Sequence, residues 1–434
     1  MPGARRTLLL AGYVFAVLAP MAFLLVSRPG EGLTAAIAFA AVLGFAALVV
    51  LALQLVLPAR ARIFTEPFGI DVLLRFHKEM GIAAAGLIVV HVVVLMVDDP
   101  SKMSLLNPLS APWRAVAGVG ALVALLLLLA SSTIRQRLAL SYEGWRFVHL
   151  TLGLVVVGAS VAHVLGVGRY LALDSLRGVA LLVVLAAALG AFVLRVGRPF
   201  AAAGRPYVLE EVRAEHGDAV TLALRADGHD GLRFAPGQFA WLKLAHAPYA
   251  LSEHPFSLSS SAEDPRYPQV TVKALGDFTA RARELAPGTR VLLDGPHGSF
   301  RPALPDAGYL CVCAGIGITP AMALLRTLAD RGDRRPITLL VGNRTPRDIT
   351  FREEVDALRA RLDLDVVHVL SRAGDDWPGE RGRIDASLLA RVLPGDAAAR
   401  NVLVCGGASF ADDVARALTG LGVPASHLHV ERFA

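Results

Sequence analysis

Long apolar stretches fill the first 200 residues of the chain and become rare after them. Six of these stretches have spanning length, at residues 8–27, 33–57, 79–97, 115–134, 147–167 and 174–195. Each is close to the ~20 apolar residues that a helix needs to cross a bilayer core. The first stretch follows a basic start without a clear cleavage site, which favours a transmembrane helix over a signal peptide. The pattern therefore predicts a bundle of six transmembrane helices.

The texture of the chain changes after residue 200. Short alternating stretches such as YVLEEV, VTLALRA and QVTVKAL, broken by Gly, Pro and Asp turns, predict a small antiparallel β-barrel. Further on, apolar strands such as YLCVCAG and ITLLVGN alternate with helical stretches such as PAMALLRTLAD, which predicts a doubly wound α/β domain. We expect a six-helix transmembrane domain over residues 1–200, a β-barrel over 201–305 and an α/β domain over 306–434.

Composition and charge support a membrane protein with soluble domains on one side. The chain is 54% hydrophobic and 18% charged, with a mean hydropathy of +0.53. Residues 1–200 hold 16 Lys and Arg against 8 Asp and Glu, whereas residues 201–434 hold 27 against 29. Because the excess positive charge lies around the apolar stretches, it indicates membrane orientation rather than a nucleic-acid partner. The predicted location is the inner (plasma) membrane, with the N-terminus and the domains after residue 200 in the cytoplasm.

Four histidines form two pairs within the apolar region. His77 and His91 lie on the third predicted helix, His149 and His163 on the fifth, and both pairs are 14 residues apart. On an α-helix this spacing is a rise of ~21 Å and a rotation about 40° short of four turns, so both members face the same way at different depths. Since odd-numbered helices run in the same direction, His77 should meet His149 near the cytoplasmic side and His91 should meet His163 near the outer side. Each level offers two imidazoles to one haem iron, so we predict two haems.

Other roles for these histidines stay open at this stage. A single intramembrane histidine serves as a ligand, a proton relay or a satisfied packing residue. Two pairs at identical spacing favour haem ligation, and a proton relay is the alternative. Two groups at the outer side bear on the electron acceptor: Arg28 and Arg169 would suit dioxygen reduction, whereas Asp98, Asp99 and Asp174 would suit a chelated cation.

A flavin motif follows in the predicted barrel. The segment APGQFAWLKL, followed by HPFSLSSS, resembles the flavin site of the ferredoxin–NADP reductase family, in the form found in NADPH oxidases and ferric reductases. The resemblance implies that His254, Pro255, Phe256 and Ser257 lie along the isoalloxazine of FAD, with Ser257 near its reactive nitrogen. An extended strand can offer backbone N–H and C=O groups to the ring edge, and a hydroxyl can tune its electronics.

The next segment, VKALGDFTARARELAPG, has a helix start that can receive the FAD phosphates. A helix N-terminus presents free N–H groups and the positive end of the helix dipole. By the resemblance, Lys273, Gly276 and Thr279 bind FAD; the alternative is an ordinary helix start. The DGPHGSF segment at residues 294–300 also matches the family's loop near the cofactor.

A glycine-rich turn opens the first helix of the α/β domain. Gly315, Gly317, Thr319 and Pro320 follow an apolar strand in the order G-x-G-x-T-P. The glycines let the backbone approach a pyrophosphate, and proline suits the first helical turn. Proline in place of the third glycine distinguishes this turn from the Rossmann fingerprint and matches the reductase family. It predicts a site for NADPH or NADH.

Further residues of the α/β domain carry family roles. Arg344, Ser371 and Arg372 follow two strands where the family binds the adenine ribose, and arginine there favours the 2′-phosphate of NADPH. Related NADH enzymes also carry such a pair, so NADH remains open. Cys405 and Gly406 resemble the family's Cys-Gly motif beside the nicotinamide, with a buried structural cysteine as the alternative. Phe433 is expected to cover the flavin until the nicotinamide displaces it, although Ala434 follows it here.

Over nearly its full length, the chain thus resembles a prokaryotic member of the NADPH oxidase and ferric reductase superfamily. The resemblance implies a flavohaem enzyme that passes electrons from NADPH through FAD and two b haems to an acceptor across the membrane. Dioxygen, giving superoxide, is the first expectation, and a ferric complex is the second. A third is an electron-carrier module that reduces a periplasmic protein or a quinone. The sequence does not predict an oligomeric state.

Overall fold

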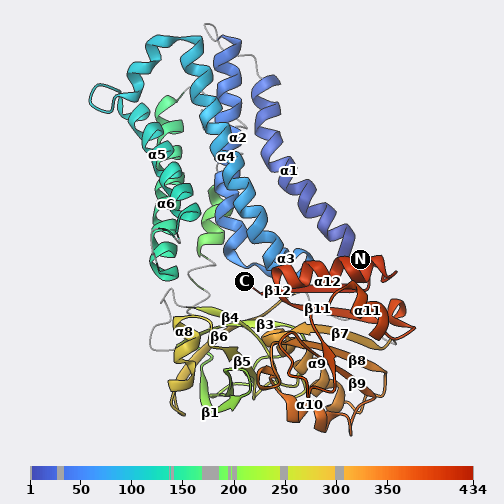
Figure 1. Ribbon diagram of the computed structural model, residues 1–434. Helices are drawn as coiled ribbons and strands as arrows, with labels where there is room; N and C mark the ends of the chain where they lie inside the picture. Colours follow the sequence, from blue (N-terminus) through green and yellow to red (C-terminus); the bar gives the residue numbers. More distant parts are fainter. Residues whose placement is uncertain are drawn as a thin grey trace. The chain divides into compact units, whose positions relative to one another are not determined.

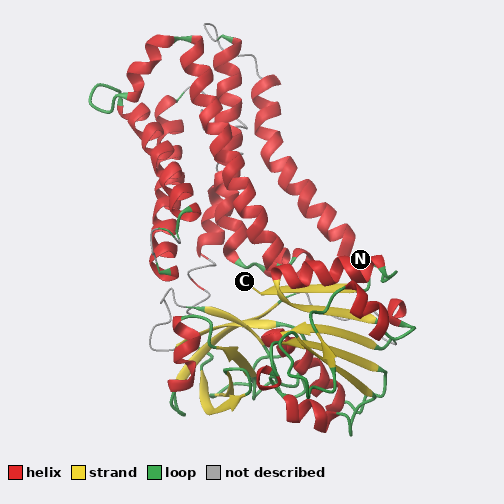
Figure 2. Ribbon diagram, viewed as in Figure 1, coloured by secondary structure: helices red, strands yellow, loops and turns green. Residues whose placement is uncertain are grey.

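The computed structural model describes residues 2–26, 34–135, 137, 141–168, 185–193, 197, 203–244, 253–298 and 307–433. The chain divides into two compact units, Met1–Gly197 and Arg198–Ala434. The first consists of helices, and the second combines helices and strands (Figures 1 and 2). The division falls where the apolar stretches of the sequence end.

The first unit is built from helices that expose many large apolar side chains. They are α1 (Pro2–Val26), α2 (Ala35–Val56), α3 (Arg62–Phe68), α4 (Ile70–Asp98), α5 (Trp113–Thr133) and α6 (Tyr142–Val167), with 3₁₀ turns η1 (Leu57–Ala59) and η2 (Pro100–Leu106). Leu127 of α5 is 54% exposed and Val93 of α4 is 52% exposed. So much apolar surface on neighbouring helices is unfavourable in water but suits a lipid surround.

Four segments of the described chain are long and apolar enough to cross a membrane. They are Ala35–Ala59, Val72–Asp98, Trp113–Thr133 and Tyr142–Val167, and they coincide with the second to fifth predicted spans. Helix α1 covers the first predicted span but is not one of the four. The sixth, 174–195, lies mostly outside the described residues, of which 185–193 are helical. The count of six spans therefore stays a prediction.

Two of these helices begin earlier than the apolar pattern indicates. Helix α4 begins at Ile70 rather than at residue 79, and α6 begins at Tyr142 rather than at residue 147. Apolar stretches mark the part of a helix that faces lipid, whereas the backbone hydrogen bonds continue through polar residues such as Lys78. Ser141 ends this continuation at α6, since its hydroxyl accepts a hydrogen bond from the backbone N–H of Gly144 (3.1 Å).

Small residues let the helices of the bundle pack closely. The shared core contains residues from four helices: Val50 and Leu51 of α2, Ala84 and Ala85 of α4, Ala124 and Leu125 of α5, and Val156 of α6. Alanine at such positions allows two helix backbones to approach. The main packed pairs are α2 with α4 and α5 with α6. Each histidine-bearing helix, α4 or α6, therefore has its own neighbour, α2 or α5.

The second unit begins with a six-stranded antiparallel sheet. Its strands are β1 (Tyr207–Glu215), β2 (Ala219–Ala226), β3 (Phe239–Leu244), β4 (His254–Ser257), β5 (Gln269–Lys273) and β6 (Arg290–His297), in the order β4-β3-β6-β1-β2-β5. A short helix, α8 (Asp277–Arg281), follows β5. An isolated bridge between Leu258 and Val270 links the two edges of this order. The antiparallel sheet matches the expectation, and its closure into a barrel stays a prediction.

A parallel six-stranded sheet forms the rest of this unit. Its strands are β7 (Tyr309–Ala314), β8 (Ile337–Asn343), β9 (Leu364–Leu370), β10 (Glu380–Arg381), β11 (Asn401–Gly407) and β12 (Leu428–Phe433), in the order β10-β9-β8-β7-β11-β12. The helices are α9 (Thr319–Asp330), α10 (Arg352–Leu358), α11 (Ala386–Val392) and α12 (Ala408–Gly420). Helices α9 and α10 pack into one apolar core, and α11 and α12 into another. This is the expected doubly wound domain.

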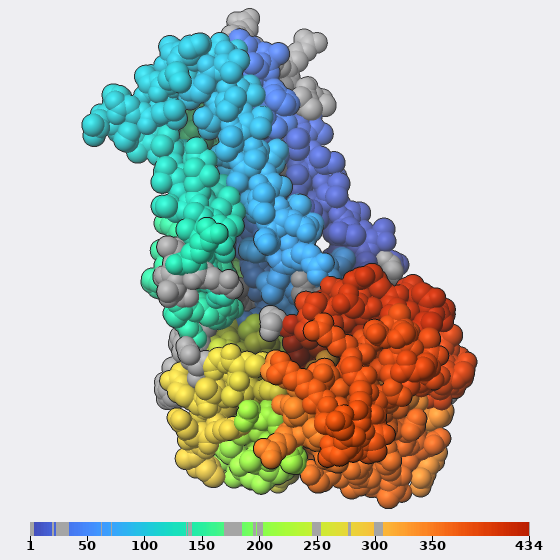
Figure 3. Space-filling model, viewed as in Figure 1, coloured from blue at the N-terminus to red at the C-terminus, as the bar shows by residue number. Residues whose placement is uncertain are grey.

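The antiparallel and parallel parts of this unit are joined by contacts from loops to helices α9 and α10. In the space-filling view, the yellow-green residues of the antiparallel part and the orange residues of the parallel part lie side by side (Figure 3). One contact is buried: the backbone N–H of Ala262 donates to the hydroxyl of Thr327 on α9 (2.9 Å), and Thr327 is fully buried. A second links α10 with the turn after β1, where His216 Nε2 lies 3.0 Å from Glu353.

Candidate functional site

The parallel sheet reverses its strand order between β7 and β11. The chain runs from β7 outward to β10 on one side, then returns to place β11 and β12 on the other side of β7. Ligands of doubly wound sheets bind outside the carboxyl ends of the strands at such a point, because the loops after the two strands diverge there. Strand β7 is followed by the turn that begins at Gly315, and β11 ends at Gly407, directly before α12. Both glycine motifs singled out in the sequence thus meet at one place.

The Gly315–Pro320 turn has a backbone that side chains would obstruct. Gly315 has a φ of +54°, in the left-handed region that favours glycine. A Cβ added at Gly317 would lie 2.4 Å from the carbonyl oxygen of Cys405, so the turn packs directly on the end of β11. The hydroxyl of Thr319 donates to the carbonyl of Ile316 (3.0 Å) and closes the turn. Pro320 then occupies the first turn of α9, whose N-terminal N–H groups suit an anion.

The Cys405-Gly406 segment packs against the Gly315–Pro320 turn. Cys405 is buried in β11, opposite Cys313 of β7. Burial, together with nearby Glu431, raises the pKa of the Cys405 thiol well above its ordinary value. The thiol is therefore protonated at neutral pH, which suits packing and argues against thiolate chemistry. Gly406 has no room for a side chain, since a Cβ there would lie 2.6 Å from the ring of Phe410.

The last strand brings Phe433 to the same edge of the sheet. Phe433 of β12 is aligned with Gly407 of β11. Its partly buried ring packs against the apolar core that includes Cys313 and Cys405. The aromatic residue expected to shield the flavin therefore lies next to the Cys-Gly segment.

The arginines expected at the adenine ribose lie on neighbouring loops. The backbone N–H of Arg372, after β9, donates to the carbonyl of Arg344, after β8 (2.8 Å). The N–H and the hydroxyl of Ser371 both point at the carbonyl of Asn343, at 3.0 and 3.4 Å. Arg344, Ser371 and Arg372 are exposed. Two guanidinium groups can thus reach a phosphate outside the carboxyl ends of β8 and β9.

The flavin motif forms β4, at one end of the strand order. The chain pairs Phe256 with Ala240 and Ser257 with Phe239 of β3. Pro255 is exposed, His254 and Phe256 are partly buried, and Ser257 is buried. Within the described chain, the Ser257 hydroxyl has no hydrogen-bond partner. A buried hydroxyl without a partner is costly, so a cofactor with polar ring atoms fits this strand.

The helix after β5, which is predicted to receive the FAD phosphates, is short. Helix α8 has five residues, and the Thr279 hydroxyl is occupied locally: it accepts from the N–H of Gly276 (2.9 Å) and donates to its carbonyl (3.0 Å). Lys273 Nζ lies 4.0 Å from Asp348 Oδ1 in the parallel-sheet part. A Cβ at Gly276 would meet nothing within 4 Å. The open space at Gly276 fits a ligand, while the two side chains already have protein partners.

In the helical unit, His91 of α4 is held by α2. Its Nδ1 lies 2.6 Å from the backbone carbonyl oxygen of Ala40. A carbonyl can only accept a hydrogen bond, so Nδ1 carries the proton and Nε2 of the neutral ring keeps its lone pair. One helical turn after Ala40, a Cβ at Gly44 would lie 3.2 Å from Nδ1 of His91. Carbonyl and glycine together form a cradle for the imidazole and leave Nε2 available to a metal.

The same cradle recurs at His163 of α6. Its Nδ1 lies 2.7 Å from the carbonyl oxygen of Arg114 on α5. A Cβ at Gly118, again four residues later, would lie 2.8 Å from Nδ1 of His163. Two helix pairs thus present a histidine in the same way, which a chance packing contact would not explain.

The other two histidines lie near each other. The ring centroids of His77 and His149 are 6.1 Å apart. This separation accommodates one metal ion bonded to a nitrogen of each ring at about 2 Å. Nδ1 of His149 lies 3.1 Å from the Ser132 hydroxyl of α5. The described residues contain no group of three or more His, Cys, Asp or Glu side chains that could hold a metal ion. A metal here would need further ligands from a prosthetic group, as haem iron has.

Several of these residues escape the sequence motifs. Gly44 and Gly118 share a signal that could have been found, a glycine on the helix before each histidine-bearing helix. Asn343, whose buried side-chain nitrogen lacks a hydrogen-bond partner among the described atoms, ends the strand before Arg344. Arg326, a partly buried arginine of α9, carries no sequence signal at all, because its partners are distant in the chain.

Comparisons with known proteins match three parts of the chain. A family model described as "Ferric reductase like transmembrane component" matches residues 43–160. Models described as "FAD-binding domain" and "Oxidoreductase NAD-binding domain" match residues 209–301 and 311–416. They follow one another in the order in which the motifs occur.

Individual relatives match the second half. The chain is 29% identical over 231 residues to the glycine betaine monooxygenase reductase subunit of Chromohalobacter salexigens, covering 51% of this chain and 62% of that protein. It is 34% identical over 219 residues to ferredoxin–NADP reductase B of Sorangium cellulosum, covering 48% and 88%. A solved structure, the ferredoxin reductase in carbazole 1,9a-dioxygenase, aligns over 53% of this chain and 69% of that chain, with 26% identity and a TM-score of 0.47. The chain thus spans less than two thirds of the first relative's length.

The packing of Gly317 makes a testable prediction. In Gly317→Ala, the added Cβ would collide with the carbonyl group of Cys405 and approach the Cα of Gly406, and the turn must move because all three atoms belong to the backbone. We expect the KM for NAD(P)H to rise about tenfold or more, equivalent to ~1.4 kcal/mol of binding, with unchanged flavin content. Steady-state kinetics with an acceptor that takes electrons directly from the flavin measure this KM. Gly395→Ala is the control, since a Cβ there meets nothing within 4 Å; equal KM values in both variants would contradict the packing argument.

The family follows from the matches taken together. The ferredoxin–NADP reductase relative is covered over 88% of its length at 34% identity. A ferric reductase-like membrane part precedes the flavin and nucleotide parts in the same chain. The resemblance indicated by the HPFS and G-x-G-x-T-P motifs is thus confirmed. This chain belongs to the NADPH oxidase and ferric reductase superfamily, with a ferric reductase-like membrane part and a C-terminal half of the ferredoxin–NADP reductase type.

Proposed function

We propose that the chain is a transmembrane NADPH oxidase that passes electrons from NADPH, through FAD and two b haems, to an acceptor across the membrane. Three domains divide this work: the haem-binding bundle at 1–200, the FAD barrel at 201–305 and the nucleotide domain at 306–434. The observation that carries the proposal is the repeated imidazole cradle, in which a carbonyl and a glycine four residues later hold His91 and His163. A reductase that passes electrons only from NADPH to its flavin would not need histidines held in this way. The two cradles therefore favour electron transfer through the helical bundle.

Two levels of histidines would hold the haems. His77 and His149 form the level on the flavin side, and His91 and His163 form the level facing the acceptor. The protonated Nδ1 of the outer pair supports ligation through Nε2, since a metal-bound histidine commonly donates its other N–H to a carbonyl. With both axial positions taken by imidazoles, an acceptor would be reduced at the haem edge rather than at the iron.

The remaining residues would bind and orient the redox partners. FAD, when bound, accepts a two-electron hydride and can give up electrons one at a time, as haem requires. His254 to Ser257 would lie along its ring, with Lys273, Gly276 and Thr279 at its phosphates. The Gly315–Pro320 turn and Gly406 would hold NADPH, Cys405 would pack beside the nicotinamide, and Phe433 would cover the flavin until the nicotinamide displaces it.

The orientation follows from the charge distribution. Positive residues surround one set of helix connections, so the flavin and nucleotide domains would face the cytoplasm from the inner (plasma) membrane. Electrons would then leave on the outer side. Dioxygen, giving superoxide, is the first candidate acceptor. Arg28, Arg169 and Asp174, which bear on this choice, lie outside the described residues. Lys102 pairs with Asp98 and Asp99 (3.2 and 3.8 Å), which partly neutralises the acidic group that a chelated cation would use.

Haem content tests the ligand assignment. His91→Leu and His163→Leu should each lose about half of the bound haem and stop electron transfer across the membrane, because one imidazole cannot hold the iron in a bis-histidine site. NADPH reduction of the flavin should persist. Pyridine haemochrome spectra and anaerobic flavin bleaching measure the two effects. His427→Leu, at a partly buried position of the second unit, is the control. Full haem content in both bundle variants would exclude the assignment.

Coenzyme preference tests the paired arginines. Arg344→Ala combined with Arg372→Ala should lower kcat/KM for NADPH by about ten- to a hundredfold, the loss of charge-assisted hydrogen bonds worth ~1.5–3 kcal/mol. The value for NADH, which lacks the 2′-phosphate, should change little. Arg416→Ala serves as the control, because this arginine of α12 is exposed and pairs only with Asp413 among its described contacts. An equal fall for both coenzymes would speak against 2′-phosphate binding.

Superoxide dismutase tests the acceptor. Cytochrome c reduction driven by NADPH should be largely abolished by dismutase if dioxygen is the acceptor. Fast reduction of ferric chelates that dismutase leaves unchanged would instead indicate a ferric reductase. Reduction of cytochrome c or a quinone analogue in the absence of oxygen would favour an electron-carrier module.

A further inference from the structure

We infer that Arg326 is a positioning residue for hydride transfer. It would hold α9, the helix that follows the Gly315–Pro320 turn, at a fixed distance from the flavin strand, β4 (His254–Ser257). The inference rests on the proposed transfer from NADPH to FAD in this chain. In that step a C–H bond of the reduced nicotinamide breaks, and its hydride, with both bonding electrons, goes to the flavin. Oxidised NADP⁺ then leaves. The rate depends steeply on the approach of the two rings.

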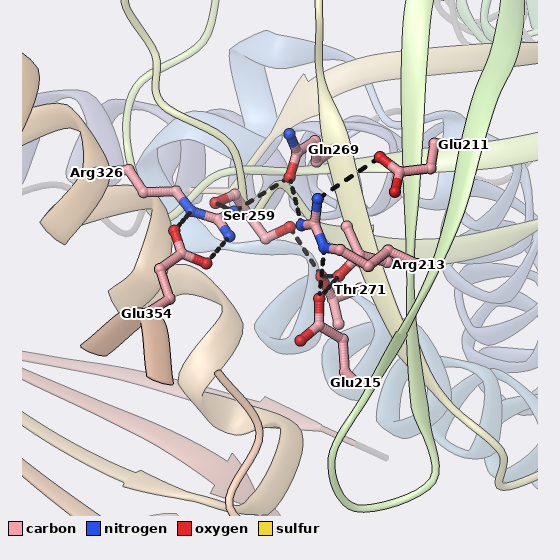
Figure 4. Close-up of polar contacts among 9 residues, drawn as sticks. Glu211, Arg213, Glu215, Ser259, Gln269, Thr271, Arg326 and Glu354 are labelled. Carbon is pink, nitrogen blue, oxygen red and sulfur yellow. Dashed lines mark hydrogen bonds and ion pairs between the residues drawn. The ribbon is translucent and has the colours of Figure 1, made fainter. Parts of the chain in front are cut away.

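Arg326 uses nearly all of its hydrogen-bonding capacity at the junction of the two sheets (Figure 4). Nε and Nη2 donate to the two carboxylate oxygens of Glu354 on α10, at 2.7 and 2.6 Å. Nη1 donates to the carbonyl of Ser259 (2.5 Å) and to the side-chain oxygen of Gln269 (3.3 Å). The guanidinium also lies over the ring of Phe351, 5.1 Å from its centroid. Only a planar fork of donors can satisfy these partners together.

One end of this contact leads directly to the nucleotide site. Arg326 lies on α9, two turns after the Gly315–Pro320 turn that opens the helix. Helix α9 is held in place around Arg326, because the neighbouring residues Leu325 and Thr327 are fully buried. A shift of Arg326 therefore moves the turn that would hold the pyrophosphate.

The other end leads directly to the flavin strand. Ser259 follows Ser257 by two residues, and its backbone is fixed: its N–H donates to the carbonyl of Gln269 (2.8 Å). Its hydroxyl lies 3.0 Å from that of Thr271, which in turn lies 2.9 Å from that of Thr221. All three hydroxyls are buried. The carbonyl that receives Arg326 is thus a fixed point of the antiparallel sheet.

Two further contacts join the segment after Ser259 to α9 and to the residue that follows it. The hydroxyl of Thr327 accepts from the N–H of Ala262 (2.9 Å), and Arg331 pairs with Glu263 (2.7 Å). Residues 259–263 therefore run along one side of α9. Arg326 is 12% exposed, whereas Arg331 is 53% exposed, so water screens the contacts of Arg326 less.

Stopped-flow kinetics of the full-length protein test the inference. Each variant is mixed anaerobically with NADPH, and with NADPH deuterated at the transferred position, while flavin bleaching is followed. Arg326→Ala should lower the limiting rate by about ten- to a hundredfold and show a larger deuterium isotope effect, with FAD content and the apparent Kd for NADPH nearly unchanged. Arg326→Lys keeps the charge without the fork and should fall between wild type and Arg326→Ala.

Arg361→Ala is the matched control. It removes an ion pair to the same helix, Arg361 to Asp330 (2.9 Å), that does not reach the flavin segment. Its limiting rate should stay within about twofold of wild type. A purely structural role of Arg326 would lower flavin content or thermal stability without changing the isotope effect.

The outcomes separate the inference from the proposed function. Arg326→Ala with full flavin content and a wild-type limiting rate overturns the positioning role alone. If Arg326→Ala does not fold, a wild-type rate in Arg326→Lys overturns it equally. A wild-type protein whose flavin is not bleached by NADPH contradicts the proposed function instead.

Discussion

The proposed haem sites depend on one property of the peptide carbonyl, which accepts hydrogen bonds and never donates one. Because Ala40 and Arg114 present carbonyls to Nδ1 of His91 and His163, each ring must carry its proton on that nitrogen. Nε2 is then the basic nitrogen, as a haem ligand requires. The neighbouring glycines permit this approach, since a Cβ at Gly118 would lie only 2.8 Å from the imidazole. The packing of α4 on α2 and of α6 on α5 therefore determines which ring nitrogen of His91 and His163 is left for the proposed bond to iron.

In the second unit, the corresponding requirement is the alignment of two candidate sites that lie on two sheets. The nucleotide edge arises where β7 and β11 diverge, and the Gly317 backbone rests against the end of β11. The flavin strand belongs to the other sheet, and Arg326 connects the two through Ser259 and Glu354. Hydride transfer needs both sites at a fixed separation, whereas electron transfer to haem tolerates longer distances. The buried contacts lie where that precision is required.

Sequence patterns predicted the helices, strands and turns that form through interactions between residues close together in the chain. The alternation of strands and helices and the G-x-G-x-T-P turn led to the doubly wound sheet, and the apolar stretches led to α2, α4, α5 and α6. Helix starts were less predictable, because α4 continues to Ile70 through charged residues that an apolar window excludes. The hydroxyl of Thr279 makes hydrogen bonds to the backbone of Gly276 at the start of a five-residue helix, and its place at the FAD phosphates stays a prediction. Arg326 needed the tertiary structure, since its partners Glu354 and Ser259 lie 28 and 67 positions away in the chain.

The most direct test of the central claim is a titration of the purified, full-length protein with NADPH in the absence of oxygen. Haem and flavin are first quantified per chain, and reduced-minus-oxidised spectra are then recorded as NADPH is added. The account predicts two b haems and one FAD per chain, with both haems reduced by NADPH at a rate that requires bound flavin. A protein that binds flavin but no haem, or whose haems stay oxidised while the flavin is reduced, would contradict it.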